Sequence, residues 1–403
     1  MYILHISADY PDSIVPEKTQ AIASLVRATS DMFDHQVISL NRENITPWQG
    51  LRCHAGQSWP AKCVARHEAR DDWVYSAPSH GVFLHSSLEC LAEILAENLL
   101  RRGHMPKLVI GHKLSMEGII AHRLGQLLGI PFGISVQGHT DQRILSVRRD
   151  LQPLYRRIFH QAAVVFPFSP WALQFCENRL GRRSGPVCLL PCISDAETII
   201  PPRQTGPRIM TAFHLRNWKV KNLPAMLLAI RQAEKSVPDL QFAIYGGGEA
   251  QDQSRVNSMV ARSRAPAKWA GSVPHASIQQ VMNGHSAFMM VSRRESFGLV
   301  FIEALRAGCP VIYPRGAAID GYFDGEHIAL GVDRNDPAAM AEAIVRTITD
   351  QQHMKQALLR WQEAGGARAF SRDHISRSFA NGLIGALQGE TGQGEIGQDG
   401  QGR

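Results

Sequence analysis

Short aliphatic runs alternate with amphipathic stretches along the first half of the chain. The runs predict strands at residues 2–7, 36–40, 107–111, 132–136 and 164–166. Between them, residues 88–101, with Ser87 as the cap, and residues 117–128 have the spacing of helices with one apolar face. This alternation is typical of a parallel sheet covered by helices on both faces.

The pattern stops at residues 190–203, where paired prolines with polar neighbours indicate a linker, and then begins again. Further strands are predicted at 209–214, 241–245, 288–291, 311–313 and 329–332, with helices at 223–235, 298–307 and 337–349. The predicted fold class is therefore α/β, with two Rossmann-like, doubly wound domains facing a central cleft. The predicted divisions are residues 1–195, residues 196–370, a helix at 371–388 that crosses back to the first domain, and a disordered Gly/Gln-rich tail at 389–403.

Composition narrows the class of protein. The 403 residues are 44% hydrophobic and 20% charged, as in soluble globular chains. No apolar run reaches the roughly 18 to 20 residues that cross a bilayer, and the first residues do not resemble a secretion signal, so we expect a cytoplasmic protein. The seven scattered cysteines include no C-x-x-C pair, which argues against a zinc site and a disulfide framework.

The net charge of +7 indicates an anionic partner. Basic residues cluster at 143–149, 156–157 and 182–183, without the interleaved aromatic residues that stack on single-stranded nucleic acid. We therefore expect no nucleic-acid partner. A solvated surface, or peripheral contact with the inner face of an anionic membrane, fits these clusters better.

The strongest chemical signal is the segment 288–313, in which a buried strand ends in a polar turn before a helix. Glu295 lies just before this helix and Glu303 about two turns into it. The open N–H groups of the first turn, together with the helix dipole, would suit a diphosphate. The candidate residues of this turn are Ser296, Phe297, Gly298 and Leu299.

In the context ESFGLVFIEALRAGCPVI, Glu295 and Glu303 resemble the E-x7-E motif of family-four retaining GT-B glycosyltransferases. The resemblance continues over nearly the whole chain beyond residue 100. It implies that Glu295 contacts hydroxyls of the donor sugar and that Glu303 contacts the ribose hydroxyls of the nucleotide.

A basic loop follows the first strand of the predicted second domain. Arg216 and Lys221 have the spacing of the family's R-x4-K pair, which implies that they grip the donor diphosphate. A guanidinium and an ammonium can neutralise the charge that grows on the leaving phosphate. Two other alignments remain open: Lys219 in the role of Lys221, and His214 at the position of the family's arginine.

Three weaker segments also resemble the family. Gly246 and Gly247 follow a predicted strand and resemble its Gly-rich loop near the diphosphate. The backbone near Trp269 occupies the place where relatives pass the nucleotide base. In the first domain, the family's catalytic histidine aligns with Gln137, and His139 is displaced by two positions, so either residue is a candidate to approach the transferred sugar.

The resemblance implies a retaining glycosyltransferase that moves a sugar from a nucleotide-diphosphate donor to a glycan, lipid-linked or small-molecule acceptor, in cell-surface polysaccharide or glycoconjugate synthesis. The chain contains no Asp-x-Asp metal motif, and we expect no metal and no other cofactor. Two alternatives remain open at this stage: a non-hydrolysing sugar-nucleotide epimerase and a non-catalytic nucleotide-sugar-binding protein.

Overall fold

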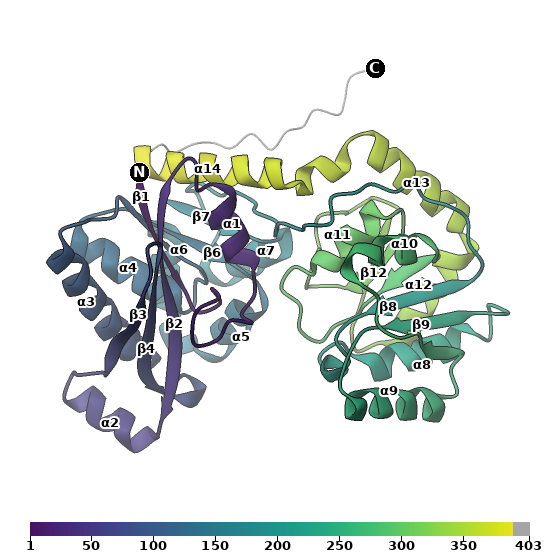
Figure 1. The fold of residues 1–403 in the computed structure, drawn as a ribbon, viewed down its shortest axis with the longest axis horizontal. Helices are drawn as coiled ribbons and strands as arrows, with labels where there is room; N and C mark the ends of the chain where they lie inside the picture. The colour runs from purple at the N-terminus through teal and green to yellow at the C-terminus, as the bar shows by residue number, and fades with distance from the viewer. Residues whose placement is uncertain (390–403) are drawn as a thin grey trace. The chain divides into compact units, whose positions relative to one another are not determined.

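The computed structural model describes residues 1–389, which form two compact units (Figure 1). Of the described residues, unit 1 contains Met1–Phe168, Ala172–Ile193 and residues 375–389, and unit 2 contains Ser169–Trp171 and Ser194–His374. Apart from Gly389, the tail predicted to be disordered lies outside the described residues.

Unit 1 is built on a seven-stranded sheet of order β3-β4-β2-β1-β5-β6-β7. All neighbouring strands are parallel except β3, which pairs antiparallel with β4. The strands are β1 (Tyr2–Ser7), β2 (Asp34–Ile45), β3 (Ala61–Arg66), β4 (Arg70–Pro78), β5 (Leu108–Gly111), β6 (Phe132–Val136) and β7 (Val164–Pro167). Strands β1, β5, β6 and β7 are almost completely buried, as expected for a parallel sheet with helices on both faces.

Helices cover both faces of this sheet. The final helix α14 lies on the same face as α1, where Phe379 packs edge-on against Phe166 and tilts against the ring of His5. Helix α4 lies on the opposite face, where Gly118 is close to Ile134. The helices are α1 (Ala21–Ala28), α2 (Pro47–Ala55), α3 (Leu84–Arg102), α4 (Glu117–Leu128), α5 (His139–Val147), α6 (Gln152–Gln161), α7 (Pro170–Leu180), which begins in unit 2, and α14 (Arg372–Gln388). No helix among residues 1–389 is both long and apolar enough to span a membrane.

The first half of unit 1 differs from the sequence prediction in two respects. Strands β3 and β4 and helices α1 and α2 were not predicted. Helix α3 begins at Leu84 and not at residue 88, so Ser87 is not a cap. It lies inside the helix, buried, and its hydroxyl donates to the carbonyl of Leu84 at 3.0 Å. The residue at the true N-cap is Phe83, which has a left-handed backbone conformation.

Unit 2 is built on a fully parallel six-stranded sheet of order β10-β9-β8-β11-β12-β13. The strands are β8 (Arg208–Ala212), β9 (Gln241–Tyr245), β10 (Ala267–Trp269), β11 (Ala287–Met289), β12 (Val311–Pro314) and β13 (Ala329–Val332). Numbered within the unit, this order is the Rossmann order 3-2-1-4-5-6. The order of the strands reverses between β8 and β11, because successive strands are added on one side of β8 and then on the other. Ligands of such sheets bind at this switch point, beyond the carboxyl ends of the strands.

The helices of unit 2 complete the layered arrangement. Helices α8 and α12 pack together and share one apolar core with β8 and β9. In Figure 1, α8 and α9 lie on one side of the sheet, and α10 and α11 on the other. The helices are α8 (Leu223–Ala233), α9 (Ala250–Ser263), α10 (Ile278–Asn283), α11 (Leu299–Arg306), α12 (Pro337–Thr349) and α13 (Gln351–Glu363). Helices α9, α10 and α13 were not predicted.

The core of unit 1 contains a chain of hydrogen bonds through three buried histidines. His5 Nδ1 is 3.0 Å from His112 Nε2, and His5 Nε2 is 2.9 Å from His35 Nδ1. Beyond His35, Nε2 lies 2.9 Å from the hydroxyl of Thr29, and beyond His112, Nδ1 lies 3.4 Å from the hydroxyl of Ser135. Burial lowers the pKa of His35 to about 4 and of His112 to about 3, and it lowers the pKa of His5 well below its ordinary value.

The direction of this chain follows from its end at Thr29. The Thr29 hydroxyl donates its proton to the carbonyl of Leu25 at 3.1 Å, so it must accept from His35. His35 then carries its proton on Nε2 and accepts at Nδ1 from His5, which in turn accepts from His112. All three rings are therefore neutral Nε2–H tautomers, and a proton added at Nδ1 of His5 or of His35 would face the N–H that this nitrogen now accepts from.

Candidate active site

Two loops of unit 2 meet at the switch point, one after β8 and one after β11. The backbone N–H of Arg293 donates to the carbonyl of Val220 at 2.8 Å, and the Arg293 side chain donates to Asn222 Oδ1 at 3.1 Å. Asn222 has a left-handed backbone conformation and precedes α8. The topology thus places both predicted motifs at the edge of the sheet where a ligand is expected.

The two motifs make direct contact. Lys221 Nζ lies 2.7 Å from Glu295 Oε2, and both side chains are largely but not fully buried. Lys219, the alternative to Lys221, points elsewhere: its ammonium lies 5.2 Å from the ring centre of Trp218. The side chain of Arg216 is exposed and forms no ion pair within residues 1–389. One cation of the predicted pair is therefore held by a carboxylate, and the other is available.

The start of α11 presents unused backbone donors. Gly298 is the N-cap, with a φ of +77°, and a Cβ at this position would lie 2.7 Å from the ring of Phe301. Among the described residues, the N–H groups of Phe297, Gly298 and Leu299 donate no hydrogen bond. The Phe297 side chain is buried, and Ser296 is half-buried. Three free donors at a helix N-terminus form an anion-binding geometry.

Glu303 lies in the second turn of α11 and is 8% exposed. Its Oε1 accepts from the Ser194 hydroxyl at 2.9 Å and lies 4.0 Å from His275 Nε2. Within residues 1–389, Oε2 has no hydrogen-bond partner. The carboxylate is therefore oriented by one oxygen and keeps the other as an acceptor, the arrangement that hydroxyl recognition requires.

The predicted Gly-rich loop has a structural reason for its first glycine. Gly246 has a φ of +143°, and a Cβ there would collide with the carbonyl oxygen of Phe213. Gly247 accepts from the Leu215 N–H at 2.8 Å, which joins the loops after β8 and β9. Trp269 ends β10, and its indole N–H donates to the Gly246 carbonyl at 3.1 Å. These residues therefore shape the edge of the sheet, and their contact with a donor remains a prediction.

In unit 1, the predicted histidine segment forms the turn between β6 and α5. His139 is the first residue of α5 and is half-buried, whereas Gln137 is buried, with its Nε2 lacking a partner within residues 1–389. Asp141 holds the turn, because its buried carboxylate accepts from the Gln137 N–H at 3.2 Å and from the hydroxyl and N–H of Ser115. Burial raises the pKa of Asp141.

A second charged group lies at the carboxyl end of β5. Lys113 Nζ is 2.6 Å from Asp9 Oδ2 and 3.4 Å from Glu117 Oε1, and Glu117 also accepts from the Ala8 N–H at 2.9 Å. Burial raises the pKa of Glu117 to about 7, although Lys113 opposes the shift. The sequence analysis missed Lys113 and Glu117. Their only signal was a charged pair spaced i, i+4 directly after a buried strand.

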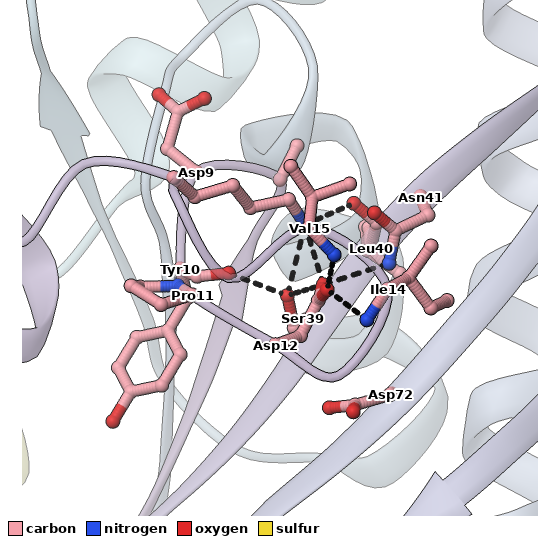
Figure 2. A network of polar contacts seen from close by, with 12 residues as sticks. Asp9, Tyr10, Pro11, Asp12, Ile14, Val15, Ser39, Leu40, Asn41 and Asp72 are labelled. Atoms are coloured by element: carbon pink, nitrogen blue, oxygen red, sulfur yellow. Dashed lines mark hydrogen bonds and ion pairs between the residues drawn. The ribbon is translucent and has the colours of Figure 1, made fainter.

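The N-terminal loop is held by one carboxylate, as Figure 2 shows. Asp12 is buried and accepts from Lys18 Nζ at 2.5 Å, Ser39 Oγ at 2.6 Å and Asn41 Nδ2 at 2.7 Å. It also accepts from two backbone N–H groups of its own loop. These hydrogen bonds hold the pKa of Asp12 well below its ordinary value against the opposing effect of burial. The sequence shows the loop but not the partners from β2.

Comparison with protein families supports the interpretation of unit 2. Residues 206–350 match the family model described as "Glycosyl transferases group 1". The GtfA subunit of the UDP-N-acetylglucosamine–peptide N-acetylglucosaminyltransferase of Streptococcus pneumoniae serotype 4 is 30% identical over 94 residues, or 23% of this chain. That match spans only 18% of the relative.

Solved structures match almost the whole chain. Sucrose-phosphate synthase from Thermosynechococcus elongatus has a TM-score of 0.64 at 17% identity, covering 96% of this chain and 100% of that one. HepE from Anabaena, solved in complex with UDP, has a TM-score of 0.62 at 14% identity, with 95% and 100% covered. The chain therefore has the two-domain GT-B fold of these structures, and residues 206–350 of unit 2 are similar to the group 1 glycosyltransferases.

Proposed function

We propose that this protein is a retaining glycosyltransferase that uses a UDP-sugar donor bound by unit 2. The observation that carries the proposal is the meeting, at the switch point between β8 and β11, of the Lys221–Glu295 ion pair with the free donors of α11. The choice of UDP is supported by two relatives: the streptococcal enzyme is named for UDP-N-acetylglucosamine, and HepE was solved with UDP.

Each residue has a proposed part in binding and transfer. The N–H groups of Phe297, Gly298 and Leu299 and the guanidinium of Arg216 hold the diphosphate. Lys221 uses one ammonium proton toward Glu295 and keeps two for phosphate oxygens. As the sugar bond breaks, these cations neutralise the charge on the leaving phosphate, so no metal ion is needed. Glu303 Oε2 accepts from the ribose, and Glu295 contacts the donor sugar.

Unit 1 has the proposed part of binding the acceptor. His139 or Gln137 approaches the transferred sugar, and the acceptor belongs to cell-surface polysaccharide or glycoconjugate synthesis. In a retaining transfer of this kind, the departing phosphate oxygen accepts the proton of the acceptor hydroxyl, which makes a protein carboxylate unnecessary as the base. Peripheral membrane contact would follow from an acceptor that resides there.

The test is calorimetric titration of the full chain with UDP, GDP and ADP, followed by turnover assays with the corresponding sugar donors. We expect UDP to bind, and Glu303→Ala to weaken it at least about tenfold. Glu326→Ala is the matched control, because Glu326 is an exposed glutamate of the same unit outside this site. Absence of nucleotide binding would refute the proposal, and turnover of the UDP-sugar without any acceptor would instead indicate an epimerase.

A further inference from the structure

Unit 1 contains a pocket of about 450 Å³ that the proposed function does not yet use. It lies at the carboxyl ends of the strands, between the segment after β4 and helix α5. Its walls include Arg42 from β2, Met116 from the turn before α4, and Arg143 and Val147 from α5. Met116 directly precedes Glu117, so the pocket borders the switch point between β1 and β5.

The charged side chains that line the pocket are all basic. Arg42, Arg143 and Arg148 line it together with His80, and the lining contains no carboxylate. Arg148 is already used, because it pairs with Asp150 at 2.6 Å and donates to the Gly81 carbonyl. The guanidinium groups of Arg42 and Arg143 form no hydrogen bond or ion pair within residues 1–389. Two unpaired guanidiniums in one pocket suit a phosphate or diphosphate.

The remaining lining is apolar. Leu84, Met116, Ile144 and Val147 contribute side chains to the pocket, and Val147 is 71% exposed on the surface of α5. Val82, next to the pocket wall, is also exposed, at 40%. Exposed aliphatic side chains beside unpaired cations fit a ligand that carries both an anionic group and an apolar chain.

The backbone of the wall is unusual. His80, Gly81 and Phe83 all have positive φ values, of 59°, 74° and 54°. Two of these residues carry a large side chain, for which this conformation is uncommon. Such conformations concentrate at functional sites, where the surrounding structure holds them in place.

We propose that this pocket binds the acceptor as an anionic amphiphile, in which a phosphate or diphosphate joins the acceptor to an apolar chain. The inference rests on the proposed function and specifies its acceptor. Arg42 and Arg143 bind the phosphate, the aliphatic residues contact the first part of the chain, and Val147 lies where the chain leaves the pocket. A sugar phosphate would satisfy the arginines but not the apolar wall.

The experiment titrates the full chain with farnesyl diphosphate, farnesol, inorganic pyrophosphate and glucose 6-phosphate, each in saturating UDP so that the donor site is filled. Farnesyl diphosphate should bind at least about tenfold more tightly than any other probe. Arg143→Gln should weaken it at least about tenfold. Arg149→Gln is the matched control and should change it less than about twofold, because Arg149 is an exposed arginine that follows α5 and does not line the pocket.

A second variant tests the apolar part. Val147→Asp should weaken the binding of farnesyl diphosphate and leave the structure intact, since the side chain is exposed. Equal losses in Arg143→Gln and Arg149→Gln would show a diffuse basic surface and overturn the proposal. Tighter binding of glucose 6-phosphate than of farnesyl diphosphate would also overturn it. Titration of Arg143→Gln with UDP alone keeps the two proposals apart, because unchanged UDP binding leaves the donor site standing.

Discussion

The two units use the carboxyl edges of their sheets in different ways. In unit 2, the edge carries an exposed arginine and backbone donors without partners, beside one ion pair. In unit 1, two carboxylates at the equivalent edge are already surrounded by protein donors: Asp12 accepts from five and Asp141 from three. The first arrangement suits an anion that supplies the missing partners. The second holds the loops of this edge in fixed positions beside the pocket that Arg42 and Arg143 line.

This difference predicts that the two units respond to different perturbations. Unit 1 depends on buried ionisable groups in defined protonation states, so acid and loss of buried carboxylates should affect its stability. The candidate site of unit 2 presents an exposed Arg216 and backbone donors without partners, so substitutions of its basic pair should affect binding and leave folding intact. Each prediction below would break or sharpen this contrast.

The largest expected effect is acid destabilisation of unit 1. His5, His35 and His112 have folded pKa values below their ordinary 6.5, so below about pH 6.5 the unfolded chain binds protons that the folded chain excludes. Stability is therefore lost as pH falls from about 6.5 toward 4, by about 1.4 kcal/mol per pH unit for each histidine. Glu117, with its raised pKa, opposes this by a similar amount. Burial also raises the pKa of Asp141, which acts in the same direction as Glu117, so the expected net loss of stability with falling pH is smaller than the sum over the three histidines.

Hydrogen exchange read by mass spectrometry can follow both units in the full chain. Protection of β1 and β5 should fall between pH 6.5 and 5, after correction for intrinsic rates, while β8 and β11 change less. His112→Leu should reduce the slope of stability against pH by about the contribution of one histidine. His104→Gln, at an exposed histidine, should leave it unchanged. A flat stability profile over this range would contradict the assignment of three neutral rings.

The next effect in size is the loss of the Asp12 carboxylate. Asp12→Ala would leave Lys18, Ser39 and Asn41 as buried donors without their shared acceptor, at a cost of about 3 to 5 kcal/mol. Chemical denaturation should show this loss, whereas Asp31→Ala, at an exposed aspartate, should change stability by less than about 0.5 kcal/mol. Unaltered stability in Asp12→Ala would show that the loop does not depend on this network.

Substitution of the basic pair in unit 2 should affect catalysis and not folding. Arg216→Ala or Lys221→Ala should reduce kcat at least roughly tenfold, the scale of losing one charge-stabilising group in the transition state. Lys221→Ala also leaves Glu295 without its ion-pair partner. Full activity in both variants would refute the assignment, as would activity that EDTA abolishes and manganese restores.

A smaller effect is expected at the residue that orients Glu303. Ser194→Ala removes the hydrogen bond to Oε1 but leaves Oε2 in place, so KM for the donor should rise a few-fold while kcat changes little. Steady-state kinetics at several donor concentrations separate the two constants. An equal fall in kcat and kcat/KM would instead indicate that Glu303 contacts the donor only in the transition state.

The smallest effect is predicted for Lys219→Ala. Its ammonium lies over the Trp218 ring and not beside Glu295, so donor KM and kcat should stay within about twofold of the parent values. A tenfold loss of kcat would show that Lys219, the alternative to Lys221, contacts the donor. This comparison decides between the two alignments that the sequence left open.

The elements that the sequence predicts best are those whose pattern is local. β1 was predicted with its observed bounds, and α14 to within one residue at each end. β4 escaped prediction because its run of RDDWVYSAP contains two aspartates, which are rare in strands. The structure tolerates Asp72 because Arg70, two residues away, and Ser13 both donate to it. The contact with Ser13 spans 59 positions, and no local pattern could reveal it.

The residues of the candidate site also divide into those that a local pattern predicts and those that only the packing reveals. Arg216, Lys221 and Glu295 lie in the loops that follow β8 and β11, so their position at the edge of a parallel sheet could be predicted. Asp12 could not be recognised as a centre, because its main partners Ser39 and Asn41 lie 27 and 29 positions along the chain. The pocket beside α5 was equally invisible, since it depends on how β2, β4 and α5 pack.

The close approach at Gly246 has a consequence for engineering. The loop after β8 and the loop after β9 lie in backbone contact, because a side chain at Gly246 would collide with the Phe213 carbonyl. The hydrogen bond from the Leu215 N–H to the Gly247 carbonyl joins the same two loops. Exchanging only one of these two loops with a relative would bring mismatched backbones into collision. To alter the choice of donor, both loops should therefore be transplanted together from the same relative, because their backbones already fit one another.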